Sequence, residues 1–209
     1  MTEEGAVDPA EREFFRDVLA GRKCRRLPSR LKRICCVDVA YSGADAFSAA
    51  VLLEGGAVAE TSFYRGRPTF PYVPGLFYLR EGPFAVKAVR GLRSRPQVVC
   101  FDGHGVAHPS RAGLATVCGR VLGLPSIGIA KSPLAGFAVK GGRVSIISLG
   151  GRTVGYVTGI GSGRRYWSPG FSVTLAQLRS IISSHGEVCL KGMVEADAAA
   201  RALAVSSRS

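Results

Sequence analysis

The segment RICCVDVAYSG, residues 33–43, decides the fold because it is a nearly continuous apolar run that contains one acid, Asp38. Such a run is typical of a strand that is buried on both faces of a sheet. The next stretch, AFSAAVLLEGGAVAETSFYR (46–65), predicts two more strands that turn at Glu54-Gly55-Gly56. We therefore predict that three antiparallel strands open the fold.

The middle of the chain has the pattern of a parallel unit. Apolar spacing predicts a helix over 76–92, entered or broken near Pro83, and then a strand over 97–103. A second helix is expected over 109–124, starting at Pro109, and a further strand over 125–132. A strand, a helix and a strand in this order predict a right-handed parallel crossover.

Both ends of the chain are predicted to be helical. Residues 8–22 have the pattern of a helix with Asp8 as its N-cap. After a hairpin over 143–159, a helix over 172–185 carries Thr174 and Gln177 in capping-box register, and a separate helix is expected over 195–205. The prediction is a single α/β domain over 1–209, in which three antiparallel strands followed by parallel strands form a mixed sheet with helices on both faces.

The charge of the chain indicates a polyanionic partner. Lys and Arg number 28 against 15 Asp and Glu, which gives a net charge of +13 and a pI near 10.0. The run 21–33 is strongly basic, and no acid occurs between 103 and 186. This balance favours nucleic acid as the partner, and Arg164 and Arg165 are further candidates for phosphate contacts.

Other features exclude several classes of protein. No apolar run approaches the roughly 20 residues of a membrane-spanning helix, and the acidic, amphipathic start resembles no secretory or transit peptide. We therefore expect a soluble, cytoplasmic protein. The six cysteines form no C-x-x-C pair, and three of them lie in apolar runs, so a zinc finger or a disulfide scaffold is not expected.

Two aspartates follow or interrupt the apolar strands. Asp38 lies inside the first strand and Asp102 ends the first parallel strand, and these two strands are expected to be neighbours near the middle of the sheet. Two adjacent buried carboxylates repel each other unless a cation lies between them. Hard oxygen ligands select Mg²⁺ or Mn²⁺, commonly with one or two carboxylates, water and substrate phosphate. A metal site for a polyanionic substrate is thus predicted, whereas each aspartate alone could be a cap or a turn residue.

The stretch FDGHGVAHPS, residues 101–110, adds two histidines to Asp102. The residues alone leave open a metal site, an acid–base site or a tight turn that carries imidazoles. A neutral imidazole is a poor ligand for Mg²⁺, so His104 is expected to be a solvated or hydrogen-bonded loop residue.

Four segments together resemble endonuclease V, the deoxyinosine-specific repair nuclease family. They are VDVAY (37–41), PYVPGLFYLRE (71–81), DGHGVAHPSRAGLA (102–115) and LPSIGIAKSPLAG (124–136), and the resemblance covers roughly residues 8–180. It implies a ribonuclease H-like fold. It also implies hydrolysis, dependent on Mg²⁺ or a substituting Mn²⁺, of the second phosphodiester bond 3′ to deoxyinosine in DNA repair, leaving a 3′-hydroxyl and a 5′-phosphate.

The resemblance also assigns residues. The metal-binding acids of the family fall on Asp38, Glu81 and Asp102, its active-site lysine falls on Lys131, and its histidine that orders the attacking water or the substrate phosphate falls on His108. Tyr72 matches an aromatic wedge that fills the space left by a flipped base, with Pro71 as part of its rigid proline-rich loop. The residues where the family closes its base pocket are Gly75, Gly103, Gly105, Gly113 and Leu134.

One departure and two rival functions accompany this interpretation. The family usually has Ser-Pro-Gly-His where this chain has Ser-Pro-Gly-Phe171, and we expect Phe171 to be a core residue beside Trp167 and Leu175. The first rival is the same chemistry on inosine-containing RNA. The second is a basic nucleic-acid-binding protein of the same fold without turnover, against which the presence of all three acids argues.

Overall fold

The structure is a computed structural model. It describes Glu11, Glu13, Phe14, Asp17, residues 27–28 and 30–134, the backbone of 137–139, and residues 145–207. The predicted cap Asp8 and most of the basic run 21–33 lie outside these residues. The four described residues of the predicted first helix are helical, and Phe14 is buried in the core.

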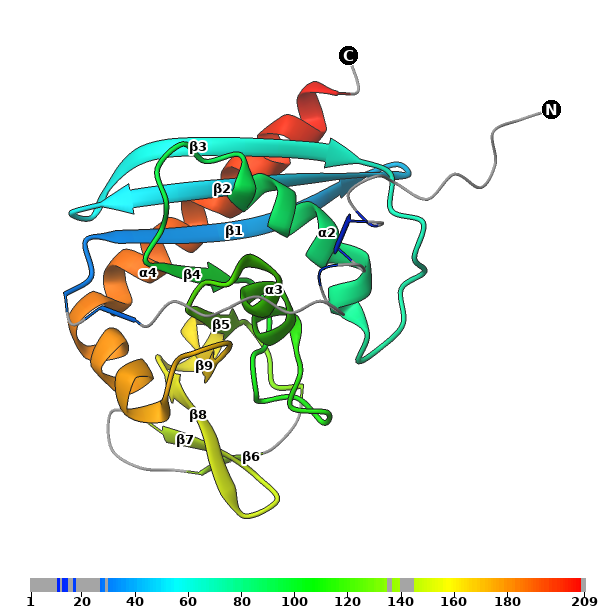
Figure 1. Ribbon diagram of the computed structural model, residues 1–209. Helices are drawn as coiled ribbons and strands as arrows, with labels where there is room; N and C mark the ends of the chain where they lie inside the picture. Colours follow the sequence, from blue (N-terminus) through cyan, green and yellow to red (C-terminus); the bar gives the residue numbers. More distant parts are fainter. Residues whose placement is uncertain are drawn as a thin grey trace.

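A nine-stranded mixed sheet forms the centre of the molecule (Figure 1). Its strands lie in the order β3-β2-β1-β4-β5-β9-β8-β7-β6. The bounds are β1 Arg33–Ser42, β2 Asp45–Glu54, β3 Ala57–Gly66, β4 Val98–Phe101, β5 Ser126–Ala130, β6 Phe137–Val139, β7 Ser145–Leu149, β8 Arg152–Thr158 and β9 Arg165–Pro169. β1, β2 and β3 are antiparallel, and β4 and β5 run parallel to β1, so the predicted opening and crossover are confirmed.

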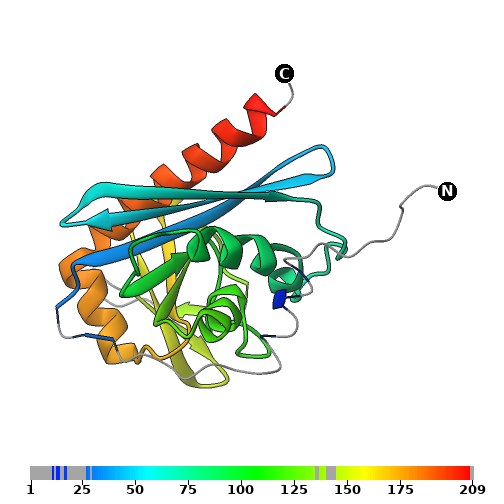
Figure 2. The same ribbon diagram turned by 45° about the horizontal axis from the view of Figure 1, so that its top comes forward.

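Helices cover both faces of the first half of the sheet (Figures 1 and 2). α2 (Phe77–Arg90) and α3 (Leu114–Leu122) pack on one face around Phe14, Val37 and Phe101. α4 (Leu175–Ser206) crosses the other face, where Cys36, Cys100 and Cys189 belong to its core. All five cysteines of the described residues are buried and unpaired.

The two predicted helices in the middle of the chain differ from the observed α2 and α3 at places where tertiary contacts decide. α2 continues through Pro83, because Glu81 to Val86 are buried and their packing offsets the lost hydrogen bond. α3 begins at Leu114 and not at Pro109, since Arg111 has a left-handed backbone with φ of 55° that a helix cannot accommodate.

The C-terminal helices predicted over 172–185 and 195–205 are one helix, α4, of 32 residues. The capping box of Thr174 and Gln177 at its start is confirmed. The helix continues through Gly192, where a Cβ would come within 2.6 Å of the Cys36 Sγ, so the helix backbone approaches the sheet closely at this residue. Sequence periodicity alone did not reveal this contact.

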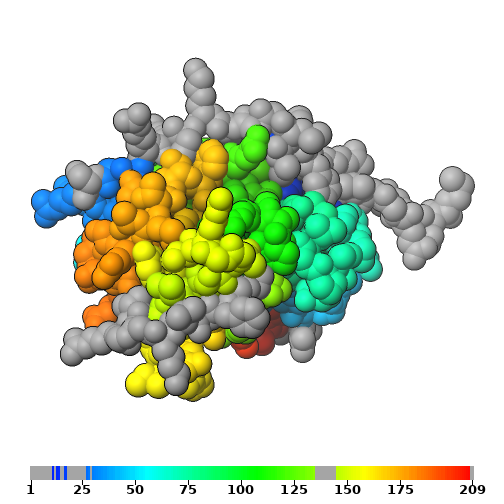
Figure 3. All heavy atoms as spheres, turned by 90° about the horizontal axis from the view of Figure 1, so that it is seen from below, coloured from blue at the N-terminus to red at the C-terminus, as the bar shows by residue number. Residues whose placement is uncertain are grey.

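The second half of the sheet projects from the first. In the view from below, the β7–β9 segment, in yellow, lies between the orange start of α4 and the green α3 region (Figure 3). A 3₁₀ turn, η1 (Gly161–Gly163), joins β8 to β9. Among the described residues, no helix combines the length and the apolar character that crossing a membrane requires.

Candidate active site

The middle of β1 and the carboxyl end of β4, two neighbouring strands, bring Asp38 and Asp102 together. β1 and β4 are parallel, with Val37 opposite Phe101, and each aspartate follows its paired residue. Adjacent parallel strands lie about 4.8 Å apart, so the two aspartates are side by side in the middle of the sheet. This juxtaposition is the one predicted from the apolar runs.

The Asp38 carboxyl is strongly perturbed. Burial and then the charge of Asp102 raise its pKa to about 7, against a hydrogen bond from the Val39 amide and the charge of Lys131, which lower it. A hydrogen bond with the side chain of Asp197 in α4 raises it further. Asp38 is therefore half protonated near neutral pH unless a cation compensates its charge.

Glu81 comes to the same group of acids from α2. It is 6% exposed, and burial followed by the charge of Asp38 raises its pKa well above the ordinary value. A hydrogen bond with the Tyr41 side chain opposes this rise in pKa. Glu81 thus lies near enough to Asp38 and Asp102 for their charges to act on its pKa.

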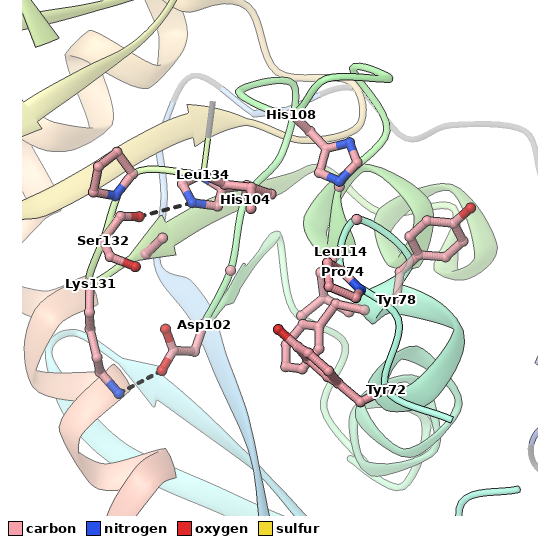
Figure 4. Close-up of a pocket in the computed structure, with 16 residues that line it drawn as sticks. Tyr72, Pro74, Tyr78, Asp102, His104, His108, Leu114, Lys131, Ser132 and Leu134 are labelled. Atoms are coloured by element: carbon pink, nitrogen blue, oxygen red, sulfur yellow. Dashed lines mark hydrogen bonds and ion pairs between the residues drawn. The ribbon is translucent and has the colours of Figure 1, made fainter. Parts of the chain in front are cut away.

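Lys131 stands just past the end of β5 and forms an ion pair with Asp102 at 2.6 Å (Figure 4). Burial lowers the pKa of Lys131, but the hydrogen bond and the charge of Asp102 outweigh it, and the pKa is raised. The ammonium group is therefore charged and held at the carboxylates. More than half of its side chain is exposed, so it also faces the surroundings.

A cavity of about 280 Å³ opens on one side of this ion pair (Figure 4). We call it the loop-side cavity, because the loop before α2 and the loops after β4 and β5 form most of its wall. Five of the predicted pocket residues line it, together with His104 and His108. The five are Tyr72, Gly75, Gly103, Gly113 and Leu134.

Tyr72 is placed as a wedge would require. Tyr72 is 66% exposed at the rim of the loop-side cavity. Its ring lies edge-on to the ring of Phe77, with 6.1 Å between the two ring centroids. Arg80 donates a hydrogen bond to the carbonyl of Phe70 at 2.7 Å, which fastens the loop to α2. Pro71 is exposed in the same loop but does not line the cavity.

The glycines serve two different purposes. Gly75 has a φ of +82°, and a Cβ on Gly113 would lie 2.4 Å from the His104 carbonyl, so both shape the cavity wall through their backbone. Gly105 does not line the cavity. A Cβ there would lie 1.9 Å from the Pro169 carbonyl, so Gly105 permits β9 to pack against the loop.

The two histidines are both buried, and of the two alternatives predicted for His104 the structure shows the hydrogen-bonded loop residue and not the solvated one. His104 donates through Nε2 to the Ser132 carbonyl at 3.0 Å, and burial lowers its pKa. Burial also lowers the pKa of His108, whose Nδ1 lies 2.8 Å from the Ser110 hydroxyl. His108 has a hydrogen bond with the backbone of Gly75 and stands on a different wall from Asp102 and Lys131 (Figure 4).

A second cavity of about 280 Å³ lies on the other side of the ion pair. We call it the helix-side cavity, since Leu190, Met193, Val194 and Asp197 of α4 line it with Asp102 and Lys131. Asp197 was missed from the sequence. The signal was present in the small residues Gly192, Ala196 and Ala200, whose spacing marks the sheet-facing side of α4 beside it.

Comparison with known proteins identifies the family. The sequence profile of endonuclease V matches residues 20–187. The endonuclease V of Saccharolobus islandicus is 40% identical over 146 residues, which cover 69% of this chain and 71% of that protein. The chain belongs to the endonuclease V family. The protein is therefore a nuclease.

Solved endonuclease V structures share this fold. The enzyme from Streptomyces avermitilis superposes with a TM-score of 0.79 at 27% identity, covering 100% of this chain and 98% of that one. The Ciona intestinalis endonuclease V, 20% identical with a TM-score of 0.72, covers 92% of this chain and 93% of its own. These similarities confirm the ribonuclease H-like mixed sheet.

The acids suit a hard divalent cation. Asp38, Glu81, Asp102 and Asp197 offer only oxygen atoms, and burial together with the neighbouring acids raises the pKa values of Asp38 and Glu81, so a bound cation would favour their ionised forms. Within the described residues no three acids, cysteines or histidines are gathered closely enough to hold one ion. The arrangement fits an ion bound by one or two carboxylates, with water and phosphate as its other ligands.

The endonuclease V family difference at Phe171 lies away from this site. The Phe171 amide donates to the Ser126 hydroxyl at 2.8 Å, at the start of β5, whereas Lys131 follows its end. Five residues of strand separate these positions by roughly 16 Å. Phe171 is half-buried, its Cβ lies near Gly119 of α3, and it lines neither of the two cavities beside Asp102.

Proposed function

We propose that the protein is a Mg²⁺-dependent endonuclease that recognises deoxyinosine in DNA and hydrolyses the second phosphodiester bond 3′ to it, in DNA repair. One observation carries the proposal: the loop-side cavity and the group of carboxylates share Asp102 and Lys131. A base held in the cavity would therefore keep its own strand beside the carboxylates.

The loop-side cavity supports recognition of a flipped base. A duplex base is accessible only after extrusion, and the exposed Tyr72 ring, braced by Phe77, can occupy the vacated place in the stack. The cavity wall at Gly75, Gly103 and Gly113 presents backbone groups at close range. Amide and carbonyl groups held this rigidly can select hypoxanthine by its hydrogen-bonding edge.

Hydrolysis requires water to attack phosphorus while the bond to the 3′-oxygen breaks and that oxygen takes up a proton. Bound Mg²⁺ or Mn²⁺ would activate the water and offset the phosphate charge. Asp38 and Asp102 would hold the cation, with Glu81 and Asp197 beside them. The Lys131 ammonium would neutralise charge that develops on the phosphate, once phosphate replaces its contact with Asp102.

We propose that His108 acts mainly through the cavity wall. Its pKa is lowered by burial, so the imidazole is neutral near pH 7, and its hydrogen bond with the Gly75 backbone secures the loop that carries Tyr72. This differs from the role in ordering water or phosphate that the family resemblance implies. The two roles predict different losses in a His108→Ala variant: weaker selection of inosine in the first, slower chemistry on every substrate in the second.

DNA is the proposed substrate, and inosine-containing RNA is the second candidate. The Ciona intestinalis endonuclease V has been solved with a 24mer DNA that contains an inosine followed by a ribo-adenosine, so that relative accepts a 2′-hydroxyl beside the lesion. For this chain the substrate is decided by comparing matched DNA and RNA strands with one inosine each.

The test is cleavage of a labelled duplex that contains one deoxyinosine, with an adenine duplex as control and with Mg²⁺ or a chelator. The proposal predicts cleavage that requires both inosine and Mg²⁺. Cleavage of RNA alone would establish the second candidate, and binding without cleavage under any metal would leave a nucleic-acid-binding protein.

A further inference from the structure

The helix-side cavity has a charged end and an aliphatic wall. One end holds the acids and Lys131, while Leu190, Met193 and Val194 of α4 form an aliphatic wall. Val194 is 66% exposed, although it lies within the same cavity as Asp102. An aliphatic surface beside a charged site favours a ligand that has both an anionic part and an apolar part.

The position of the helix-side cavity indicates which part of the substrate would bind there. Asp102 and Lys131 line both cavities, so the two openings lie on either side of one ion pair. If the loop-side cavity holds the inosine base and the carboxylates hold the cut phosphate, the strand must leave on the helix side. The group that meets the aliphatic wall is then the nucleotide whose 5′-phosphate is released by the cut.

A positive charge at the rim of the helix-side cavity is consistent with a strand that leaves the cut site on this side. Arg165 lines the helix-side cavity, and its Nη1 donates to the carbonyls of Ser162 at 3.2 Å and Arg164 at 2.8 Å. These hydrogen bonds fix a guanidinium where the downstream backbone would pass. The side chains of Leu190 and Val194 have no hydrogen-bonding group, so the wall can support a sugar or a base face but cannot distinguish one base from another.

We propose that the helix-side cavity is a sequence-neutral subsite for the nucleotide immediately 3′ of the cut, which contacts Met193 and Val194 through its sugar and base. The inference rests on the proposed function for the direction of the strand. It assigns α4 a direct part in substrate binding in addition to its cover of the sheet.

The experiment measures binding in the presence of a chelator, by fluorescence anisotropy, to single-stranded inosine oligonucleotides of three kinds. The first ends in a 3′-phosphate one nucleotide after inosine, so that the phosphate of the cut bond is present in all three; the second has one more nucleotide, and in the third that added nucleotide is abasic. We expect the second to bind about five-fold more tightly than the first, the gain from removing roughly 40 Å² of apolar surface from water. The abasic form should show less than half of this gain.

Two valines on the same helix provide the variant and its control. Val194→Ala should reduce the five-fold gain to about two-fold, because it removes methyl groups from the wall. Val205→Ala should keep it, since Val205 is 67% exposed on α4 but lies outside the cavity. Both side chains are exposed, so neither substitution threatens the fold.

The proposal is overturned if the added nucleotide gives no gain, if its abasic form gives the full gain, or if the two valine variants behave alike. Failure of the proposed function has a different signature. In that case oligonucleotides with adenine in place of inosine bind as tightly as the inosine series at every length.

Discussion

The two cavities beside Asp102 and Lys131 have the same volume but opposite construction. The loop-side cavity is built from loops near the carboxyl ends of β4 and β5 and from the segment before α2, with glycines and aromatic side chains. The helix-side cavity takes one wall from α4, a helix far from Asp102 in the sequence, which presents the aliphatic side chains of Leu190, Met193 and Val194. A wall of backbone groups can distinguish one base from another, whereas an aliphatic wall can only pack against a base. The ion pair of Asp102 and Lys131 therefore separates a cavity that can select a base from one that can only hold a nucleotide.

The shared residue should have the largest effect. Asp102→Asn keeps the size of the side chain but removes the charge that would hold the cation, so inosine-dependent cleavage should fall by at least about 100-fold. Binding of inosine DNA, measured by anisotropy in a chelator, should change by less than about three-fold, because the basic surface supplies most of the affinity.

Asp45→Asn is the matched control for this substitution, since Asp45 pairs with Arg65 at the start of β2, away from both cavities. It should leave cleavage unchanged. An Asp102→Asn protein that retains its single-turnover rate would remove this carboxylate from the chemistry.

Asp197→Ala tests the helix side of the comparison alone, because it removes the side chain that hydrogen-bonds Asp38. Asp197 has a hydrogen bond with Asp38, and a hydrogen bond to a charged group contributes about 2 kcal/mol, so cleavage should slow by about 30-fold. The ratio of inosine to adenine binding should stay as it was, because the loop-side cavity is untouched. A variant that loses this ratio would show that the two cavities are not separate in function.

Tyr72→Ala tests the loop side. The wedge offsets unstacking, a cost of a few kcal/mol in a duplex that is small in a single strand. Cleavage of duplex inosine DNA should fall by about ten-fold and that of single-stranded inosine DNA by less than about two-fold. Equal losses on the two substrates would mean that Tyr72 only packs its loop against Phe77.

The dependence of Mg²⁺ binding on pH tests the ionisation of the Asp38 carboxyl beside Asp102. Because the Asp38 pKa is raised to about 7 from 3.8, the metal-free protein loses stability as the pH rises between these values, where the folded state keeps a proton that the unfolded state has released. Mg²⁺ needs the ionised carboxylate, so the stabilisation it provides should be present at pH 8 and lost as the pH falls through about 7.

Thermal unfolding with and without Mg²⁺ at pH 6 and pH 8 measures this difference directly. We expect an increase in melting temperature of a few degrees at pH 8 and of less than about one degree at pH 6. The same increase at both pH values would contradict the raised pKa of Asp38.

Phe171→His should have the smallest effect on activity. Phe171 follows β9 and lines neither cavity, so an imidazole there should change cleavage by less than about two-fold, while the loss of apolar contact near Gly119 should lower the melting temperature by about 2–4 °C. A faster variant of unchanged stability would place this position in the catalytic apparatus.

The same comparison explains what the sequence could predict. Asp38 and Asp102 were predictable because each follows strand residues whose apolar pattern fixes their place in the sheet, and most of the loop-side cavity lies in contiguous motifs. Asp197 was not, since its place depends on α4 being one continuous helix that packs on β1 and β2. Likewise, the role of Gly105 depends on its contact with Pro169, 64 residues away, which no local pattern indicates.

The central claim is that one ion pair joins a base-selecting cavity to the site of hydrolysis, with the cut displaced from the selected base. Mapping the cut on labelled duplexes in which a single deoxyinosine is moved stepwise along the strand tests it most directly. The account predicts that the cut moves with inosine, always at the second phosphodiester bond on its 3′ side, and leaves a 5′-phosphate. A cut that stays in place as inosine moves, or that falls directly beside inosine, would contradict it.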